Sequence, residues 1–174
     1  MQQQAQKKFN QQINHLTVMI EITPEIRGIK YEYDKQVNAL VVDRYMTASM
    51  HYPLPYGFAP ETLALDGDPL DVLVISPYPL LPGVYINVEP IAALKMSDEA
   101  GQDEKILAVP ACQYLRAGVK VPSSLAEVDP SLMASISHFF THYKDHEDGK
   151  WVKIDGWCDR QEAQELVRCA IENY

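Results

Sequence analysis

The first two thirds of this chain are made of short segments rich in β-branched and aromatic residues, with no long helical pattern between them. Turn residues such as "DKQVN" and "PYPLLPG" separate the segments, which span 17–22, 29–34, 39–46, 70–76, 84–94 and 105–110. A doubly wound parallel sheet needs a helix between consecutive strands, so the pattern argues against one. It favours a closed or nearly closed small β-barrel.

The last third of the chain changes to a helical period. After Asp129, apolar residues recur three and four positions apart, which predicts a helix that begins at Pro130 with Asp129 as its N-cap. The same spacing after Asp159 predicts a second helix, and 150–157 has the pattern of one more strand. The fold class is therefore expected to be mainly β with α.

Length and composition indicate one domain. With 174 residues, of which 47% are hydrophobic, the chain can bury one core but is short for two ordinary domains. We expect a single domain over 17–174, preceded by a polar, glutamine-rich tail over 1–16 that lacks the features of a secretory signal. The 3 cysteines show no CxxC spacing, which predicts reduced thiols and a cytoplasmic protein.

The charge and hydropathy of the chain argue against two classes of partner. A net charge of −9 is unlike the basic stripe of a nucleic-acid-binding surface. Charge or proline interrupts every apolar run within about ten residues, so no run is long enough to span a membrane. We expect neither nucleic acid nor a membrane as a partner.

Three aspartates stand close together in "DGDPLD" (66–71), immediately before an apolar run. Like charges at this spacing repel one another unless a cation offsets them. An Asp-Gly turn accounts for the first of them, but not for Asp71, which falls inside a predicted strand. The segment is not an EF-hand loop, because Leu70 and Pro77 stand where that loop requires an oxygen ligand and a glutamate.

Two interpretations of the aspartates remain open. A phosphatase of the haloacid dehalogenase type would use Asp66 as its nucleophile, although that fold requires parallel strands with helical crossovers. The alternative is a cluster of oxygen ligands for several Mg²⁺ ions, and a second acidic segment at 95–105 supports it. Taken alone, that segment is equally typical of a solvated loop.

Charged residues also stand inside the early predicted strands. Alternate strand residues share a face, so Lys30 and Glu32 are expected to point to one side and Tyr31 and Tyr33 to the other. Such a face is common on a half-exposed sheet, but carboxylates gathered with Lys and Arg also suit a site for metals and a polyanion. No His–Cys cluster competes, so the expected metal is Mg²⁺, with Mn²⁺ as a possible substitute.

Six segments stand out along the chain: "IKYEYDK", "DRYM", "YPLPYGF", "DGDPLDV", "KMSDEAGQDEKILAVP" and "HFFTHYKDHEDGKWVKIDGW". In this order they resemble landmarks of the soluble family I inorganic pyrophosphatases of bacteria. The resemblance runs from about Val18 to the C-terminus. It implies a five-stranded OB-type β-barrel with flanking helices, and a Mg²⁺-dependent hydrolysis of pyrophosphate to two orthophosphates.

The resemblance also implies a role for each matching residue. The acidic residues that would hold metal ions are Asp66, Asp71, Asp98, Asp103, Glu32 and Glu21. The residues that would hold the phosphates are Lys30, Arg44, Tyr56, Lys105, Tyr143 and Lys144. Asp68 would take a proton from the attacking water, with Tyr56 as a second catalytic group and Tyr52 nearby. Ca²⁺ is expected to inhibit, because it is larger and takes looser coordination.

Bacterial members of the family are typically hexamers, and "SHFFTHY" resembles a subunit-contact helix in them. His138 and His142 are four residues apart and share one helix face. We therefore expect a homohexamer, although two surface histidines without a role would give the same pattern. An OB-type module that only binds a polyanion is a further alternative, but such modules show a basic groove with exposed aromatics.

Overall fold

The computed structural model describes residues 13–174, so residues 1–12 of the expected tail lie outside the described part of the chain. The strands are β1 (Leu16–Ile22), β2 (Ile29–Asp34), β3 (Ala39–Tyr45), β4 (Tyr56–Phe58), β5 (Asp71–Val74), β6 (Tyr85–Asp98), β7 (Gly101–Gln102), β8 (Lys105–Pro110) and β9 (Val152–Cys158). The helices are α2 (Pro130–His142) and α3 (Arg160–Asn173), with short 3₁₀ turns η1 (Cys112–Tyr114) and η2 (Leu125–Glu127).

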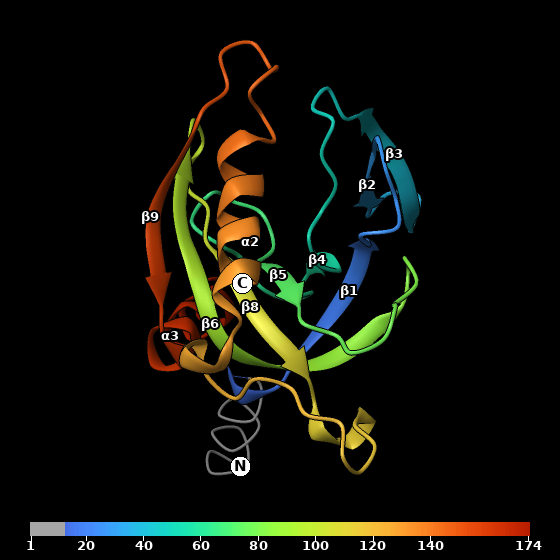
Figure 1. Cartoon of the computed structure of the whole chain (residues 1–174). Helices are drawn as coiled ribbons and strands as arrows, with labels where there is room; N and C mark the ends of the chain where they lie inside the picture. The colour runs from blue at the N-terminus through green and yellow to red at the C-terminus, as the bar shows by residue number, and fades with distance from the viewer. Residues whose placement is uncertain (1–12) are drawn as a thin grey trace.

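Five strands close into a ring (Figure 1). β1 pairs with β4, β4 with β5, β5 with β8, β8 with β6, and β6 pairs again with β1. Only the β5–β8 pairing in this ring is parallel. Closure leaves the ring without an open edge. This is the five-stranded, OB-type arrangement that the resemblance implied, so the expected fold class is confirmed.

Three predicted strands lie outside the ring. β2 and β3 pair only with each other, as a separate two-stranded sheet beside the end of β1 (Figure 1). β9, the strand predicted over 150–157, pairs antiparallel with the second half of the long strand β6. β4 was not expected, because three residues between prolines are too few to show a strand period.

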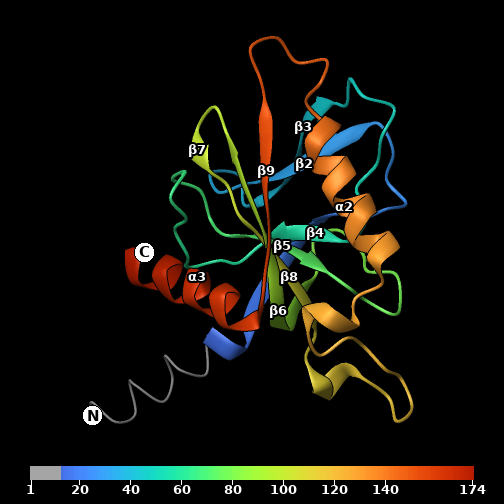
Figure 2. The same ribbon diagram turned by 60° about the vertical axis from the view of Figure 1, so that its left-hand side comes forward.

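Successive strand residues pack into two different cores. Val72 and Val74 of β5 belong to a core that includes α3, whereas Leu73 between them belongs to a core that includes α2. Figure 2 shows the two helices on different sides of the strands. Asp71 stands two residues before Leu73, so the alternation of a strand directs it to the α2 side, where its register partner is Lys105.

Both helices begin where the sequence predicts. The side chain of Asp129 accepts a hydrogen bond from Ser131 N at 2.8 Å, and that of Asp159 accepts one from Glu162 N at 3.1 Å. Each carboxylate satisfies an amide that the first helical turn leaves unpaired. The caps thus fix where the two helices start against the strands.

The three cysteines are unpaired thiols: Cys112 is exposed, Cys158 is buried and Cys169 is half-buried. None of them lines the cavity described below. Among the described residues, no helix has the length and apolar character needed to cross a bilayer.

Candidate active site

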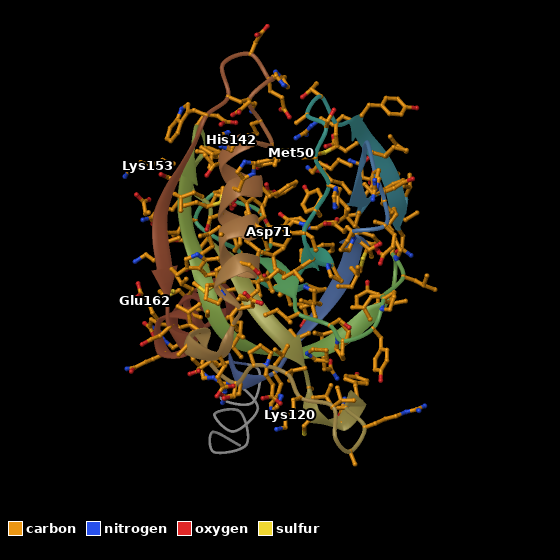
Figure 3. The ribbon with its side chains drawn as sticks, viewed as in Figure 1. Met50, Asp71, Lys120, His142, Lys153 and Glu162 are labelled. Atoms are coloured by element: carbon orange, nitrogen blue, oxygen red, sulfur yellow. The ribbon has the colours of Figure 1, made fainter. Side chains whose placement is uncertain are left out.

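A cavity of about 710 Å³ lies where the two-stranded sheet, the ring of strands and the loop after α2 meet. Every residue that the sequence analysis assigned to the site lines it, namely Glu21, Lys30, Glu32, Arg44, Tyr56, Asp66, Asp68, Asp71, Asp98, Asp103, Lys105, Tyr143 and Lys144. Figure 3 shows Asp71 near the middle of the molecule, beside α2. The structure therefore brings all of these residues together, whereas their individual roles stay predictions.

The aspartate segment reaches the cavity through a tight turn. Gly67 has a φ of 93°, a conformation that glycine adopts without the steric cost of a side chain. The Asp66 carboxylate accepts a hydrogen bond from Asp68 N at 3.0 Å, and Ala64 N donates to Asp68 O at 2.8 Å. The turn thus presents Asp66 and Asp68 at the cavity, and β5 begins directly afterwards at Asp71.

Lys105 is the buried cation of the site. Its side chain is 3% exposed, and its Nζ lies 2.5 Å from a carboxylate oxygen of Asp71 and also contacts Asp103. Burial alone would lower the pKa of this ammonium group, but the two carboxylates together raise it above its ordinary value. Lys105 is therefore a permanent positive charge between two aspartates.

Burial raises the pKa values of three carboxyl groups at the cavity, including one that pairs with Lys105. Burial raises the pKa of Glu21 to about 7, even though the carboxylate accepts a hydrogen bond from Tyr33 N at 2.7 Å. Burial also raises the pKa values of Asp66 and Asp103. The cavity lining also carries more acidic than basic side chains, so added cations would be bound favourably.

Asp98 is the exception among the buried carboxylates. Burial acts to raise its pKa, but Lys144 and the amide of Ala100 lower it below its ordinary value. Lys144 Nζ lies 2.6 Å from one Asp98 oxygen, and Ala100 N donates to the other at 2.8 Å. Asp98 is therefore held as a carboxylate, fixed in place at the cavity wall.

Tyrosine hydroxyls form the wall near α2. Tyr52 packs against Phe139 of α2 with ring centroids 4.6 Å apart, and against Tyr56 at 4.8 Å. Burial raises the pKa values of Tyr52, Tyr56 and Tyr143 above the ordinary tyrosine value. All three hydroxyls thus remain protonated at neutral pH and can donate hydrogen bonds to an anion.

The two-stranded sheet differs in part from the expected alternation. Lys30 and Glu32 share the cavity side and pair with each other, as predicted. A register shift lies between Lys30 and Tyr31, however, and Tyr33 also lines the cavity. The extra residue of this irregularity is Asp43 on β3. Tyr33 reaches the edge of the cavity with its amide, which donates to Glu21, while its ring lies against Phe58 with centroids 5.8 Å apart.

Charged residues at the site that received no role from the sequence include Asp43, Glu147 and Lys150. Asp43 lies 3.2 Å from Lys30 Nζ and accepts from Arg44 Nη1 at 2.7 Å. Glu147 and Lys150 both line the cavity from the loop after α2. A charge inside the apolar strand "ALVVDRY" was a signal for Asp43, and the other two belong to a segment that already carried the family resemblance.

The donor set agrees with a hard divalent metal. The cavity offers carboxylate oxygens and no cysteine or histidine, which is the ligand type that Mg²⁺ takes. Within residues 13–174, no three such side chains converge as a formed metal site. Lys105 forms ion pairs with Asp71 and Asp103 in this arrangement. These two carboxylates would therefore have to reorient to bind a metal ion.

Comparison with known proteins decides the family. The sequence model described as "Inorganic pyrophosphatase" matches residues 18–174. The chain belongs to the inorganic pyrophosphatase family. An inorganic pyrophosphatase of Xanthomonas axonopodis pv. citri is 46% identical over 97% of this chain and 92% of its own length. One of Yersinia pestis is 49% identical over 89% of this chain and 88% of its own length.

Solved structures agree with the sequence relatives. An inorganic pyrophosphatase of Coxiella burnetii superposes with a TM-score of 0.85 at 47% identity, over 93% of this chain and 96% of that one. The enzyme of Thermus thermophilus gives 0.85 at 42% identity, over 92% and 91%. The resemblance drawn from the sequence is confirmed: the chain is a hydrolase of this family. It is neither a phosphatase of the haloacid dehalogenase type nor a binding module alone.

Proposed function

We propose that this chain hydrolyses inorganic pyrophosphate to two orthophosphates in a Mg²⁺-dependent reaction. One observation carries the proposal: a single cavity collects more carboxylates than cations, some of the carboxylates buried, together with lysine, arginine and tyrosine donors. Pyrophosphate is a polyanion. A site that binds it therefore needs more positive charge than the amount that offsets the site's own carboxylates. Metal ions bound by these carboxylates would provide that excess.

The residues that would hold Mg²⁺ are Asp66, Asp71, Asp98, Asp103, Glu32 and Glu21. When bound, the metal would lower the pKa of water toward neutral and offset the charge of the phosphates. Asp71 would be one of these ligands, as the family resemblance implies; it stands at the start of β5 and reaches the cavity beside Lys105. Mn²⁺ would be a substitute, whereas Ca²⁺ would inhibit because its looser coordination misplaces the reactants.

The cationic and hydroxyl groups would bind the phosphoryl oxygens. We assign this role to Lys30, Arg44, Tyr56, Lys105, Tyr143 and Lys144. Their fixed charges and hydrogen-bond donors are preorganised for the charge that develops on the transferring and leaving groups. The raised pKa of Tyr56 supports its assignment as a donor at neutral pH.

Asp68 would act on the attacking water. Its side chain lines the cavity and forms no ion pair within residues 13–174, so its oxygens are available to take a proton. No covalent intermediate is required, since water is the nucleophile. Tyr56, the second catalytic group that the resemblance implies, would assist by orienting the substrate.

We further propose a cytoplasmic homohexamer. The three unpaired cysteines support a reducing compartment. Tyr78, Leu81 and Tyr85 stand within one stretch of eight residues and stay more than half exposed on the single chain. Exposed apolar side chains this close together are typical of a contact surface, which supports assembly.

Phosphate release with pyrophosphate as substrate tests the function. We expect activity that disappears in EDTA, returns with Mg²⁺ and is inhibited by added Ca²⁺. A phosphomonoester at the same concentration is the control and should be hydrolysed far more slowly. Equal rates on the two substrates, or activation by Ca²⁺, would contradict the proposal.

A further inference from the structure

An ion pair joins two walls of the cavity that no strand pairing connects. Arg44 stands on β3, in the separate two-stranded sheet, and Glu147 stands in the loop between α2 and β9. Arg44 Nη2 lies 3.3 Å from a carboxylate oxygen of Glu147, and both residues line the cavity. Figure 1 shows β3 and the loop after α2 facing each other across the upper part of the molecule.

Arg44 is anchored at both terminal nitrogens. Nη1 donates to Asp43 at 2.7 Å, and Nη2 pairs with Glu147. Asp43 belongs to the same strand as Arg44, so it fixes the guanidinium relative to β3 only. Glu147 connects the guanidinium to the opposite wall of the cavity, the loop between α2 and β9. A guanidinium has five N–H donors, so further donors remain for a phosphate.

The backbone of Glu147 is itself fixed next to a second candidate phosphate ligand. Glu147 N donates to Lys144 O at 2.9 Å, and Lys150 N donates to Glu147 O at 3.1 Å. Lys144 and Glu147 therefore belong to one turn. This turn and the ion pair together link Lys144 to Arg44 across the cavity.

We propose that Glu147 is a positioning residue that holds Arg44 at a set spacing from Lys144 for pyrophosphate binding. This inference rests on the proposed function. A long arginine side chain loses rotamer freedom when it binds an anion, and an anchor that removes this freedom beforehand strengthens binding. Because the anchor acts before the chemical step, its loss raises KM more than it lowers kcat.

Glu147→Gln removes the charge and keeps the shape. We expect KM for magnesium pyrophosphate to rise about two- to fivefold, with kcat within about twofold, given the strength of partly exposed ion pairs. Glu147→Asp keeps the charge on a shorter side chain and should rescue KM in part. Asp148→Asn is the matched control: it removes the same charge at the next position, which is exposed and does not line the cavity.

The Arg44→Gln background tests whether Glu147 acts through Arg44. In that background, Glu147→Gln should cause no further rise in KM. An undiminished rise would overturn the inference, as would an effect no larger than that of Asp148→Asn. A fall in KM for Glu147→Gln would also overturn it, because Glu147 would then compete with the substrate for Arg44.

Thermal unfolding without metal or substrate separates this inference from the proposed function. The falls in Tm caused by Arg44→Gln and Glu147→Gln should be non-additive by about 1–3 °C, since one interaction is lost in both. If the wild-type protein fails to hydrolyse pyrophosphate, the proposed function is wrong. The non-additive Tm changes would still show that Arg44 and Glu147 interact. Additive Tm changes together with an unchanged KM would refute the positioning role alone.

Discussion

Asp68 and Asp71 stand three residues apart but have different surroundings. Asp71 opens β5 and pairs with the buried ammonium of Lys105, whereas Asp68 is exposed at the cavity and forms no ion pair within residues 13–174. A carboxylate that already pairs with a cation, as Asp71 does with Lys105, is suited to binding cations. A carboxylate without a partner is suited to accepting a proton.

Asparagine at each position should separate the two roles. Asp71→Asn should weaken Mg²⁺ binding, so that activity partly returns as Mg²⁺ is raised. Asp68→Asn should bind metal and substrate nearly normally and lose about 10²–10⁴-fold in kcat, which a higher pH restores in part. The measurement is a magnesium titration of kcat for both variants, with circular dichroism as the folding control. Rescue of Asp68→Asn alone would reverse the assignments, and losses below about tenfold in both would place the site elsewhere.

Glu21 makes the stability of the metal-free protein depend on pH. Its pKa rises from 4.5 to about 7 on folding because of burial, so the folded state binds the proton more tightly than the unfolded state. The stabilisation is complete below about pH 4.5 and is lost as the pH rises through about 7. Each pKa unit corresponds to about 1.4 kcal/mol, so the loss is of the order of 3 kcal/mol.

Glu21→Gln removes this titration and keeps an oxygen that can accept from Tyr33 N. In urea unfolding with EDTA, the variant should match the wild type near pH 4 and exceed it by up to about 3 kcal/mol near pH 8. The other buried carboxylates are common to both proteins, so the difference isolates Glu21. A constant difference across this range would contradict the expected titration.

Among the elements, β4 depends on one glycine. Gly57 is the register partner of Ile20 in β1, and a Cβ atom at Gly57 would stand 1.8 Å from Met19 O. No side chain fits at that distance, so any larger residue must push β4 away from β1. Tyr56 and Phe58 on either side both line the cavity, and the strand pairing is what places them there.

Gly57→Ala should therefore unfold at a much lower urea concentration, with a loss of at least about 3 kcal/mol, and lower the activity through Tyr56. Gly83→Ala is the control. Gly83 has a φ of 87°, but a Cβ there would meet only Leu40 Cδ1 at 3.9 Å. Its cost should be limited to backbone strain of about 1–2 kcal/mol. Equal losses in the two variants would show that the β1–β4 approach does not govern stability.

At the scale of the whole molecule, α2 presents two histidines near its C-terminal end. The rings of His138 and His142 are 4.7 Å apart, as the four-residue spacing predicts, and His138 is exposed on the single chain. Figure 3 shows His142 at the end of α2 nearer the loop. A helix face with two adjacent imidazoles suits a contact with a second copy of the same face.

Sedimentation at neutral pH should show a hexamer, and replacing both His138 and His142 by alanine should weaken it if their shared helix face is a subunit contact. A monomer at neutral pH would contradict the assembly. A hexamer unchanged by the double substitution would contradict only the part assigned to the histidines.

The sequence by itself determined the type of most elements and the membership of the site. Apolar period and capping residues act between near neighbours, which is why Asp129 and Asp159 mark the helix starts and most strands lie where expected. The clustered aspartates of 66–71 indicated a cation-binding site without any knowledge of the fold, because unpaired charges that close are unfavourable.

Only the tertiary structure decided how these parts meet. Ring closure depends on Leu16 pairing with Val88, far along the chain, and no local pattern encodes that partner. The raised pKa of Glu21 and the pairing of Arg44 with Glu147 likewise arise from residues brought together by packing. Local propensity acts over a few residues, whereas burial and charge pairing act across space, so these features appear only once the chain has folded.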